Sequence, residues 1–387
     1  MKKRAKILSI LLLILCTSGC WDSQRLSSRA LVAGIGIDRN DQGEIELTAQ
    51  IIKPGGLNPN SASGGSSEES VFVASTTGRT IFDAVRQFSK TVSRKLYFEQ
   101  NRIVVFDQEI AEEGLTEFID FFMRDHETRK RAFILVCKKS AKSFLSAKSD
   151  IEKIPASEVL ALMHNQSSTS EVAINDLHGL SIQIESPYTS PYAPLVCTQT
   201  KEDGEEKVAF FGTAAFKEDK LVGFLDAKES RGLLFLQNKI KSGIIVIISP
   251  EDNVSNIALE IINVKSSYKP SLVNGQFVID LNIFAVVSIG DIQMPISLIG
   301  SKRISQIQQR CKQEIISQVD ACLYKLQEDL KTDIIGIGES IYNKYPKQWK
   351  EFSSNWPNNF NKIKINTNVK VQIEHTGIIT DPLQKQK

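Results

Sequence analysis

The pattern of hydrophobic and polar positions predicts short strands and helices mixed along the first half of the chain. Residues 31–37 and 44–51 alternate as two strands, and residues 38–43 between them are rich in turn formers. Other apolar runs predict strands, and apolar stripes at helical spacing predict helices. The predicted strands are 71–75, 102–106 and 132–137, and the predicted helices are 80–93, 115–123 and 155–164. Strands alternating with helices favour a mixed α/β unit.

The second half contains the strongest helical signal. Between residues 301 and 331, apolar side chains recur at steps of three and four, which predicts one long amphipathic helix. They are Ile304, Ile307, Cys311, Ile315, Val319, Cys322, Leu326 and Leu330. These steps fit a straight helix better than a heptad, so packing across a sheet is favoured over a coiled coil with a partner. Strands are expected at 208–216, 221–225, 244–249, 257–265, 277–289 and 363–374, and helices at 229–239 and 337–349.

The predicted fold class is therefore mixed α/β (α+β), with about three globular units in which helices pack on mixed sheets. Gly and Ser dominate residues 55–70, which predicts a flexible loop. Pro187, Pro191 and Pro194 punctuate an extended connector, and a charged loop follows at 201–207. The expected units are an N-terminal α/β region at 20–198, divided into 20–145 and 146–198, and a C-terminal α/β domain at 205–387.

The N-terminus has the three parts of an export signal. Basic residues lie within Met1–Lys6, an apolar run follows at Ile7–Cys16, and small residues lead to Cys20. A ten-residue apolar helix covers about 15 Å, roughly half of a hydrocarbon core of ~30 Å. We therefore expect residues 1–19 to be a cleaved signal peptide, and an uncleaved N-terminal anchor is the alternative.

The end of this segment, Ser18-Gly19-Cys20, resembles a bacterial lipobox. The resemblance implies diacylglyceryl attachment to the Cys20 thiol, cleavage between Gly19 and Cys20, and acylation of the new amine. Thr17 stands where the motif usually has Leu, and Leu15 lies two residues further back. Two or more acyl chains anchor a protein stably. Trp21 would then sit either at the headgroup layer or packed on the body.

Composition limits the other classes of function. The chain has 387 residues, of which 41% are hydrophobic and 24% charged, as in ordinary globular proteins. The net charge is +2, and four of the positive side chains lie in the first six residues, so the remaining body is close to neutral. A nucleic-acid partner is not expected, because such proteins need a basic face.

The residue types of common catalytic and metal sites do not cluster. The four His are scattered, which predicts no metal site and no cofactor. Gly34-Ile-Gly36 lacks the third Gly of a dinucleotide motif, so close packing or a turn is favoured. The stretch from Asp38 to Gly43 imitates a calcium loop, but Ala49 stands where a bidentate Glu is needed, so a hairpin turn is favoured. Residues 125–127 (Asp-His-Glu) are interpreted as a solvated helix end. We expect no catalytic residues and no enzyme activity.

The remaining cysteines, Cys137, Cys197, Cys311 and Cys322, have no CxxC spacing. Cys311 and Cys322 are too far apart along one helix to bridge each other. Buried thiols that act as small hydrophobic side chains are predicted. A disulfide between more distant pairs stays open in an exported chain.

Several sequence blocks resemble the Ger(x)C family, the C subunit of spore nutrient germinant receptors, nearly from end to end. In the first half they are GCWD at 19–22, VAGIGID at 32–38, GRTIFDA at 78–84, SRKLYF at 93–98 and FFMRD at 121–125. In the second half they are GTAAFK at 212–217, LVGFLD at 221–226, RGLLFL at 231–236, GESIY at 338–342, KYP at 344–346 and Trp349. Gln24-Arg25 departs from the Arg-Glu that often follows Cys-Trp-Asp.

This resemblance implies a lipoprotein on the outer face of the spore inner membrane, in a complex with the A and B integral-membrane subunits. Such a complex senses small nutrients and triggers germination, and the family has no known catalytic residues. The alternatives are an extracytoplasmic solute-binding lipoprotein, which would need two similar lobes around a cleft, and an exported enzyme. Each of these would carry a ligand or catalytic cluster that the sequence does not reveal.

Overall fold

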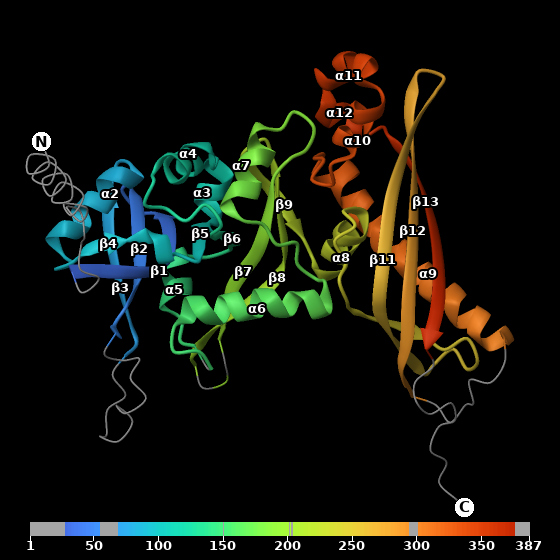
Figure 1. Ribbon diagram of the computed structural model, residues 1–387, viewed down its shortest axis with the longest axis horizontal. Coiled ribbons are helices and arrows are strands. Elements are labelled where there is room, and N and C mark those ends of the chain that lie inside the picture. Colours follow the sequence, from blue (N-terminus) through green and yellow to red (C-terminus); the bar gives the residue numbers. More distant parts are fainter. Residues whose placement is uncertain are drawn as a thin grey trace, which may run out of the picture.

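The computed structural model describes residues 28–54, 69–149, 151–200, 202, 204–293 and 301–375. Its strands form two sheets, and helices pack on both (Figure 1). The mixed α/β fold class is thereby confirmed. The expected signal peptide, Gly19 and Cys20 lie outside the described residues, as does most of the loop predicted at 55–70.

The first sheet has nine strands in the order β3-β2-β1-β5-β6-β7-β8-β9, with β4 paired to β1. Strands β1, β5, β6 and β7 are parallel to one another, whereas both ends of the sheet are antiparallel. The strands are β1 Arg29–Arg39, β2 Ile45–Ile52, β3 Val71–Gly78, β4 Lys95–Tyr97, β5 Ile103–Asp107, β6 Phe133–Cys137, β7 Tyr192–Thr200, β8 Glu206–Lys217 and β9 Lys220–Leu225. The boundary expected between 198 and 205 thus falls in the β7–β8 connection, and the first sheet itself continues to Leu225.

Helices cover both faces of the first sheet. One core joins the sheet to α2 Ile81–Gln87, α3 Gln108–Glu113, α4 Thr116–Arg124 and α7 Leu177–Glu185. A second core, on the other face, involves α5 Ala141–Ser146 and α6 Pro155–Thr169. The strands between them, such as β5, are buried along their whole length, as parallel strands covered on both sides must be.

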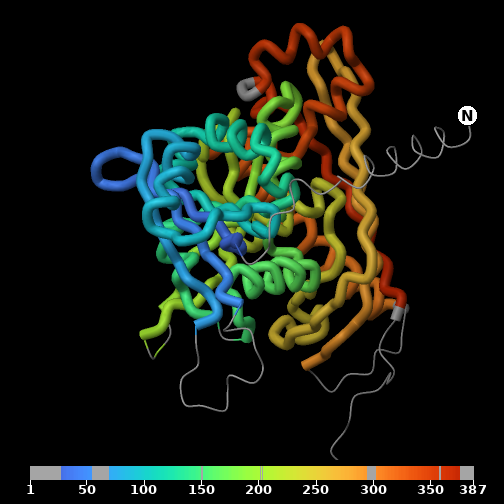
Figure 2. Tube along the Cα trace, turned by 60° about the vertical axis from the view of Figure 1, so that its left-hand side comes forward, coloured from blue at the N-terminus to red at the C-terminus, as the bar shows by residue number. Residues whose placement is uncertain are grey.

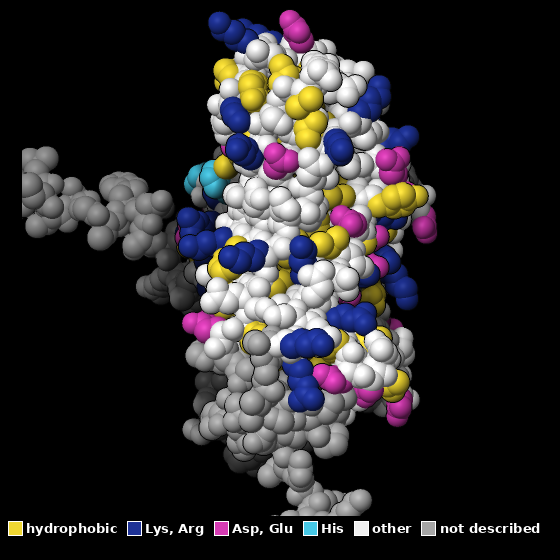
Figure 3. Space-filling model, turned by 90° about the vertical axis from the view of Figure 1, so that its right-hand side faces the viewer, with side chains coloured by type: hydrophobic (Ala, Val, Ile, Leu, Met, Phe, Trp, Pro, Cys, Tyr) yellow, Lys and Arg dark blue, Asp and Glu magenta, His cyan; other side chains and the backbone are white. Residues whose placement is uncertain are grey.

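The second sheet has the order β10-β11-β12-β13, and β11 and β12 form a long hairpin that stands beside the first sheet (Figures 1 and 2). Its strands are β10 Ile244–Ile248, β11 Asn256–Val273, β12 Gln276–Ile292 and β13 Lys364–His375. The helices of this half are α8 Ala227–Leu236, α9 Ser301–Tyr324, α10 Ile337–Lys344, α11 Pro346–Ser353 and α12 Trp356–Phe360. On the side of the molecule that carries this sheet, basic side chains are interspersed with small hydrophobic patches (Figure 3).

The long helix predicted at 301–331 is confirmed, with a change in its last turn. Helix α9 is α-helical to Tyr324 and ends in one π-helical turn at Lys325–Asp329. The side chains predicted to form its apolar stripe are buried in the core of the second sheet, from Ile307 to Leu326, while Ile304 and Leu330 are half-buried at its edge. The helix lies across the sheet and also packs on α8.

Two expectations about prolines are wrong. The helix expected at 337–349 is interrupted at Tyr345, because Pro346 disfavours helical backbone in the residue before it, and α11 begins at Pro346. The connector expected around Pro194 is strand β7, in which Pro194 pairs with Thr213 of β8. Strand β6 pairs with β7 only at Leu195 and Val196, so no hydrogen bond between β6 and β7 is lost because Pro194 lacks an N–H.

Candidate functional site

The candidate site is a groove of about 870 Å³ between α2, β4 and α4, on the face of the first sheet that these helices cover. Its floor is apolar and its rim is charged. The apolar side chains that line it are Phe82, Val85, Phe88, Val92, Leu96, Phe98 and Phe121. Phe88, Leu96 and Phe98 belong to the core beneath, whereas Phe82 is 53% exposed. A volume of this size lies in the range of ligand-binding clefts.

The helices that bound the groove are fixed by local sequence signals. Thr80 caps α2, because its hydroxyl accepts a hydrogen bond from the backbone N–H of Asp83 at 3.1 Å. Helix α4 places Phe118, Ile119 and Phe122 on its buried side, which leaves Phe121 toward the groove. The rings of Phe82 and Phe121 lie 6.4 Å apart between their centroids, so the two helices bring together aromatic side chains that are far apart in sequence.

Charges on the rim are balanced, and four of the eight form two ion pairs. Lys95 Nζ lies 2.6 Å from Glu127 Oε1, and Arg124 Nε lies 2.7 Å from Asp120 Oδ2. The Arg86 guanidinium stands over the Phe82 ring, 4.7 Å from its centroid, as in a cation–π contact. The rim cations are Arg86, Arg94, Lys95 and Arg124, and the rim carboxylates are Glu117, Asp120, Asp125 and Glu127. Such a rim suits a ligand of low net charge.

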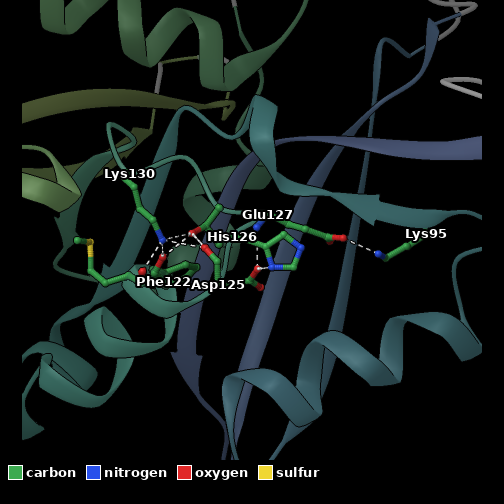
Figure 4. Close-up of polar contacts among 8 residues, drawn as sticks. Lys95, Phe122, Asp125, His126, Glu127 and Lys130 are labelled. Atoms are coloured by element: carbon green, nitrogen blue, oxygen red, sulfur yellow. Dashed lines mark hydrogen bonds and ion pairs between the residues drawn. The ribbon is translucent and has the colours of Figure 1, made fainter. Parts of the chain in front are cut away.

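The Asp-His-Glu stretch at 125–127 is the end of α4, as the sequence predicts. Lys130 Nζ donates to the carbonyl oxygens of Phe122 and Asp125 at 2.6 and 2.8 Å, and so satisfies the last turn of the helix (Figure 4). Burial lowers the pKa of Lys130. The His126 side chain is 93% exposed, and Glu127 pairs with Lys95 on the rim of the groove.

A second cluster of polar side chains lies at the carboxyl ends of the parallel strands, where α/β proteins often bind ligands. Asp38 at the end of β1 accepts hydrogen bonds from the N–H groups of Ala141 and Lys142, at 2.7 and 2.9 Å. Asp107 at the end of β5 accepts one from Ile110 N–H at 2.8 Å. Burial, and secondarily the charge of Asp38, raise the pKa of Asp107 to about 6. Both carboxylates therefore cap helices.

The Gly34-Ile-Gly36 segment packs closely under α5, which confirms the packing interpretation. A Cβ on either Gly would lie 3.0 Å from the Leu145 side chain. The calcium-like stretch is confirmed as a hairpin turn, in which the Asn40 side chain accepts hydrogen bonds from the N–H groups of Gln42 and Glu44. Within the described residues no group of three or more His, Cys, Asp or Glu is arranged to hold a metal ion.

The cysteines behave largely as predicted. Cys137, Cys311 and Cys322 are buried and Cys197 is half-buried, and all four are free thiols. Burial raises the pKa of Cys137 to about 11 and that of Cys311 to about 12. Among residues 28–375, as far as they are described, no helix is both long enough and apolar enough to cross a membrane.

The groove is not evident from the sequence, although three of the blocks quoted above meet there. Phe82 lies in the block at 78–84, Lys95 and Leu96 in that at 93–98, and Phe121 in that at 121–125. The signal available in the sequence was the excess of Phe in these segments. Nothing local showed that the three segments adjoin, because β4 reaches this position through parallel pairing with β1.

Comparisons with known proteins cover almost the whole chain. Two family profiles match, described as "Spore germination protein N-terminal domain" at residues 22–197 and "Spore germination B3/ GerAC like, C-terminal" at residues 211–377. The chain is 28% identical to spore germination protein KC of Bacillus subtilis over 99% of this chain and 98% of that one. It is 25% identical to spore germination protein A3 of the same organism, over 97% and 98%.

A solved structure has the same fold. The crystal structure of the GerBC protein matches with a TM-score of 0.58 and 19% identity, over 91% of this chain and 99% of that one. At that identity the match establishes the fold alone. The two profiles together span most of both halves of the chain, in the order in which the resemblance places its blocks. This chain belongs to the Ger(x)C family of spore germination proteins.

Proposed function

We propose that this chain is a non-catalytic, lipid-anchored subunit of a spore germinant receptor. Cys20 is its attachment point, carrying the diacylglyceryl group and palmitate or a similar N-acyl chain after cleavage behind Gly19. The body lies on the outer face of the spore inner membrane and acts by contact with the A and B integral-membrane subunits. The observation that carries the proposal is the run of small residues, Thr17-Ser18-Gly19, directly before Cys20, in a chain whose family consists of spore germination proteins.

Anchoring supplies the mechanism, because it confines the body to the membrane that holds its partners. Confinement raises the effective concentration of the body next to those subunits, so modest contacts suffice for assembly. The structure supports action by contact rather than by chemistry. Its buried carboxylates at the sheet edge cap helices, and its groove has an apolar floor with a rim of balanced charge. A nutrient ligand of the complex would then act through the assembled subunits.

The solute-binding alternative expects two similar lobes. The two sheets have nine and four strands and different strand orders, so this likeness is lacking in the described part of the chain. Calorimetry with amino acids and sugars on the body distinguishes the two functions. Micromolar binding by the isolated body would favour the solute-binding class.

Replacing the proposed attachment residue tests the anchor. In sporulating cells, Cys20→Ala should abolish incorporation of labelled palmitate, move the chain from the membrane to the soluble fraction, and slow nutrient-triggered germination. Cys16→Ala is the matched control, since it changes a thiol four residues earlier and leaves Cys20 intact. Normal labelling, membrane retention and germination of the Cys20→Ala strain would refute the proposal.

A further inference from the structure

The groove lies where the described chain begins. Arg29 pairs with Lys95 and Ala30 with Leu96 through the parallel β1–β4 contact, and Lys95 and Leu96 both line the groove. The chain therefore leaves the body one strand away from the groove wall. Seven residues, Trp21–Ser27, separate Cys20 from Ser28. Fully extended they span at most about 24 Å, so every residue of the segment is held close to this end of the molecule.

The groove presents an incomplete aromatic site. Phe82 is more than half exposed, its ring faces Phe121, and Arg86 covers only part of it. An exposed aromatic side chain beside a second ring and an arginine can accept one more flat aromatic group by stacking or edge contact. The rim also carries the carboxylate of Glu117, a hydrogen-bond acceptor for an N–H donor, whereas the carboxylate of Asp120 is engaged by Arg124. An indole combines both properties, with its apolar rings and its single N–H.

We propose that the groove is the docking site of the chain's own N-terminal segment, with the Trp21 side chain as its anchor. The segment suits the groove in composition. Trp21 and Leu26 are its two large apolar side chains, and Asp22 and Arg25 balance each other in charge, as the rim charges do. Closing so short a loop costs little. Burial of one aromatic side chain then supports a docked-to-free ratio of about tenfold.

Docking has a consequence that rests on the anchoring proposed above. With Trp21 in the groove, the acylated residue 20 lies immediately beside α2 and α4. The tether then has no slack, and the groove end of the body faces the lipid surface in one orientation. A body tethered by seven free residues would tumble, whereas a docked one presents a fixed surface to membrane partners.

Acrylamide quenching of Trp21 tests the docking without lipid and without the thiol. The protein is the chain from residue 20 onward with Cys20→Ala, which contains every described residue. Trp349 and Trp356 are buried, and subtracting the signal of the Trp21→Phe variant removes their contribution. We expect Trp21 to be quenched about tenfold less than in a free peptide of residues 20–27, in line with the docked ratio.

Two matched variants then identify the groove as the occupied surface. Phe82→Asp should restore quenching to the level of the free peptide. Phe72→Asp changes a similarly exposed Phe on β3 that does not line the groove, and should leave Trp21 protected. Quenching at the peptide level in the parent chain, or protection that Phe82→Asp does not remove, overturns the proposal. Protection that appears only after adding phosphatidylglycerol–phosphatidylcholine vesicles overturns it in favour of the headgroup layer.

The two proposals fail separately. An unprotected Trp21 in this soluble chain leaves lipid attachment at Cys20 intact. An unmodified Cys20 in spores leaves the docking measured in solution intact.

Discussion

Adding one methyl group at Gly232 should destabilise the protein, although the same change stabilises most helices. Gly232 lies within α8, where it faces α9. A Cβ at this position would stand 2.2 Å from the carbonyl oxygen of Gln318 and 2.8 Å from the Cβ of Cys322. The first of these atoms belongs to the backbone of α9, so relief requires the two helices to move apart.

The magnitude follows from two opposing effects. Ala in place of Gly inside a helix is favourable by about 1 kcal/mol. Overpacking a core costs about 1–3 kcal/mol, and the upper end applies where the obstacle is backbone. The net expectation for Gly232→Ala is a loss of about 2 kcal/mol in the free energy of unfolding. For a cooperative unit of about 180 residues, the size of the second half of the chain, that lowers Tm by about 5 °C.

Thermal unfolding followed by far-UV circular dichroism measures this loss. Gly290→Ala is the matched control, because a Cβ there meets its nearest atom, the Ala258 carbonyl oxygen, at an ordinary 3.7 Å. The control should change the unfolding free energy by no more than about 0.5 kcal/mol. A Gly232→Ala chain as stable as the parent would refute the close packing of α8 on α9.

Two further predictions concern titration and thiol reactivity. The pKa of Asp107 in the folded chain, about 6, exceeds its ordinary value of 3.8, so folding favours the protonated acid and this group's contribution to stability falls as pH rises from 4 to 6. Asp107→Asn keeps a capping side chain but cannot ionise, so it should remove up to about 3 kcal/mol of this pH-dependent loss of stability. The variant should therefore show a flatter dependence of Tm on pH. An unchanged slope would contradict the burial of the Asp107 charge. In the folded chain, a thiol reagent should modify half-buried Cys197 well before Cys137, Cys311 and Cys322, and mass mapping that finds Cys311 or Cys322 modified first would contradict the packing of α9.

The sequence predicted elements whose signals are local. The stripe of α9 could be read from spacing alone, and its members from Ile307 to Leu326 are buried as expected. The helix α7 was missed, because Leu180, Ile182 and Ile184 alternate as in a strand and Gly179 weakens the helical pattern. Strand β11 was expected to end before Pro270, yet it continues to Val273. Since β10 pairs only with the first residues of β11, Pro270 sits beyond that contact and its missing N–H is tolerated.

The groove could not be predicted, because it depends on pairing between distant segments. The order β1-β5-β6-β7 places α2 and α4 on the same face, and no local pattern encodes that order. The polar side chains that drew attention in the sequence, Asp38 and His126 among them, turned out to serve a helix cap and an exposed helix end. The local roles of single side chains could be predicted from the sequence, whereas the segments that adjoin in space could not.

The blocks by which the chain resembles its family divide into two physical kinds. In the second half, glycines allow backbones to approach. A Cβ on Gly212 would lie 2.1 Å from the Leu225 carbonyl oxygen, and one on Gly338 would lie 2.4 Å from that of Tyr188. Core packing accounts for these positions. It does not account for Phe82, whose ring is largely in water although folding would gain from burying it.

Phe82 shares its groove with residues from the blocks at 93–98 and 121–125, as the docking contact proposed above requires. The groove also adjoins β1, the strand with which the described chain begins. Under the anchoring and docking proposed above, contacts made there would act on the orientation of the body at the membrane, whereas changes at Phe82, which is not a core residue, would leave the core intact. Changes at Gly232 or Gly338 act through stability instead. A Phe82 variant that loses germination but keeps the Tm of the parent would therefore mark the groove as a contact surface. A Gly232 or Gly338 variant should lose Tm together with germination.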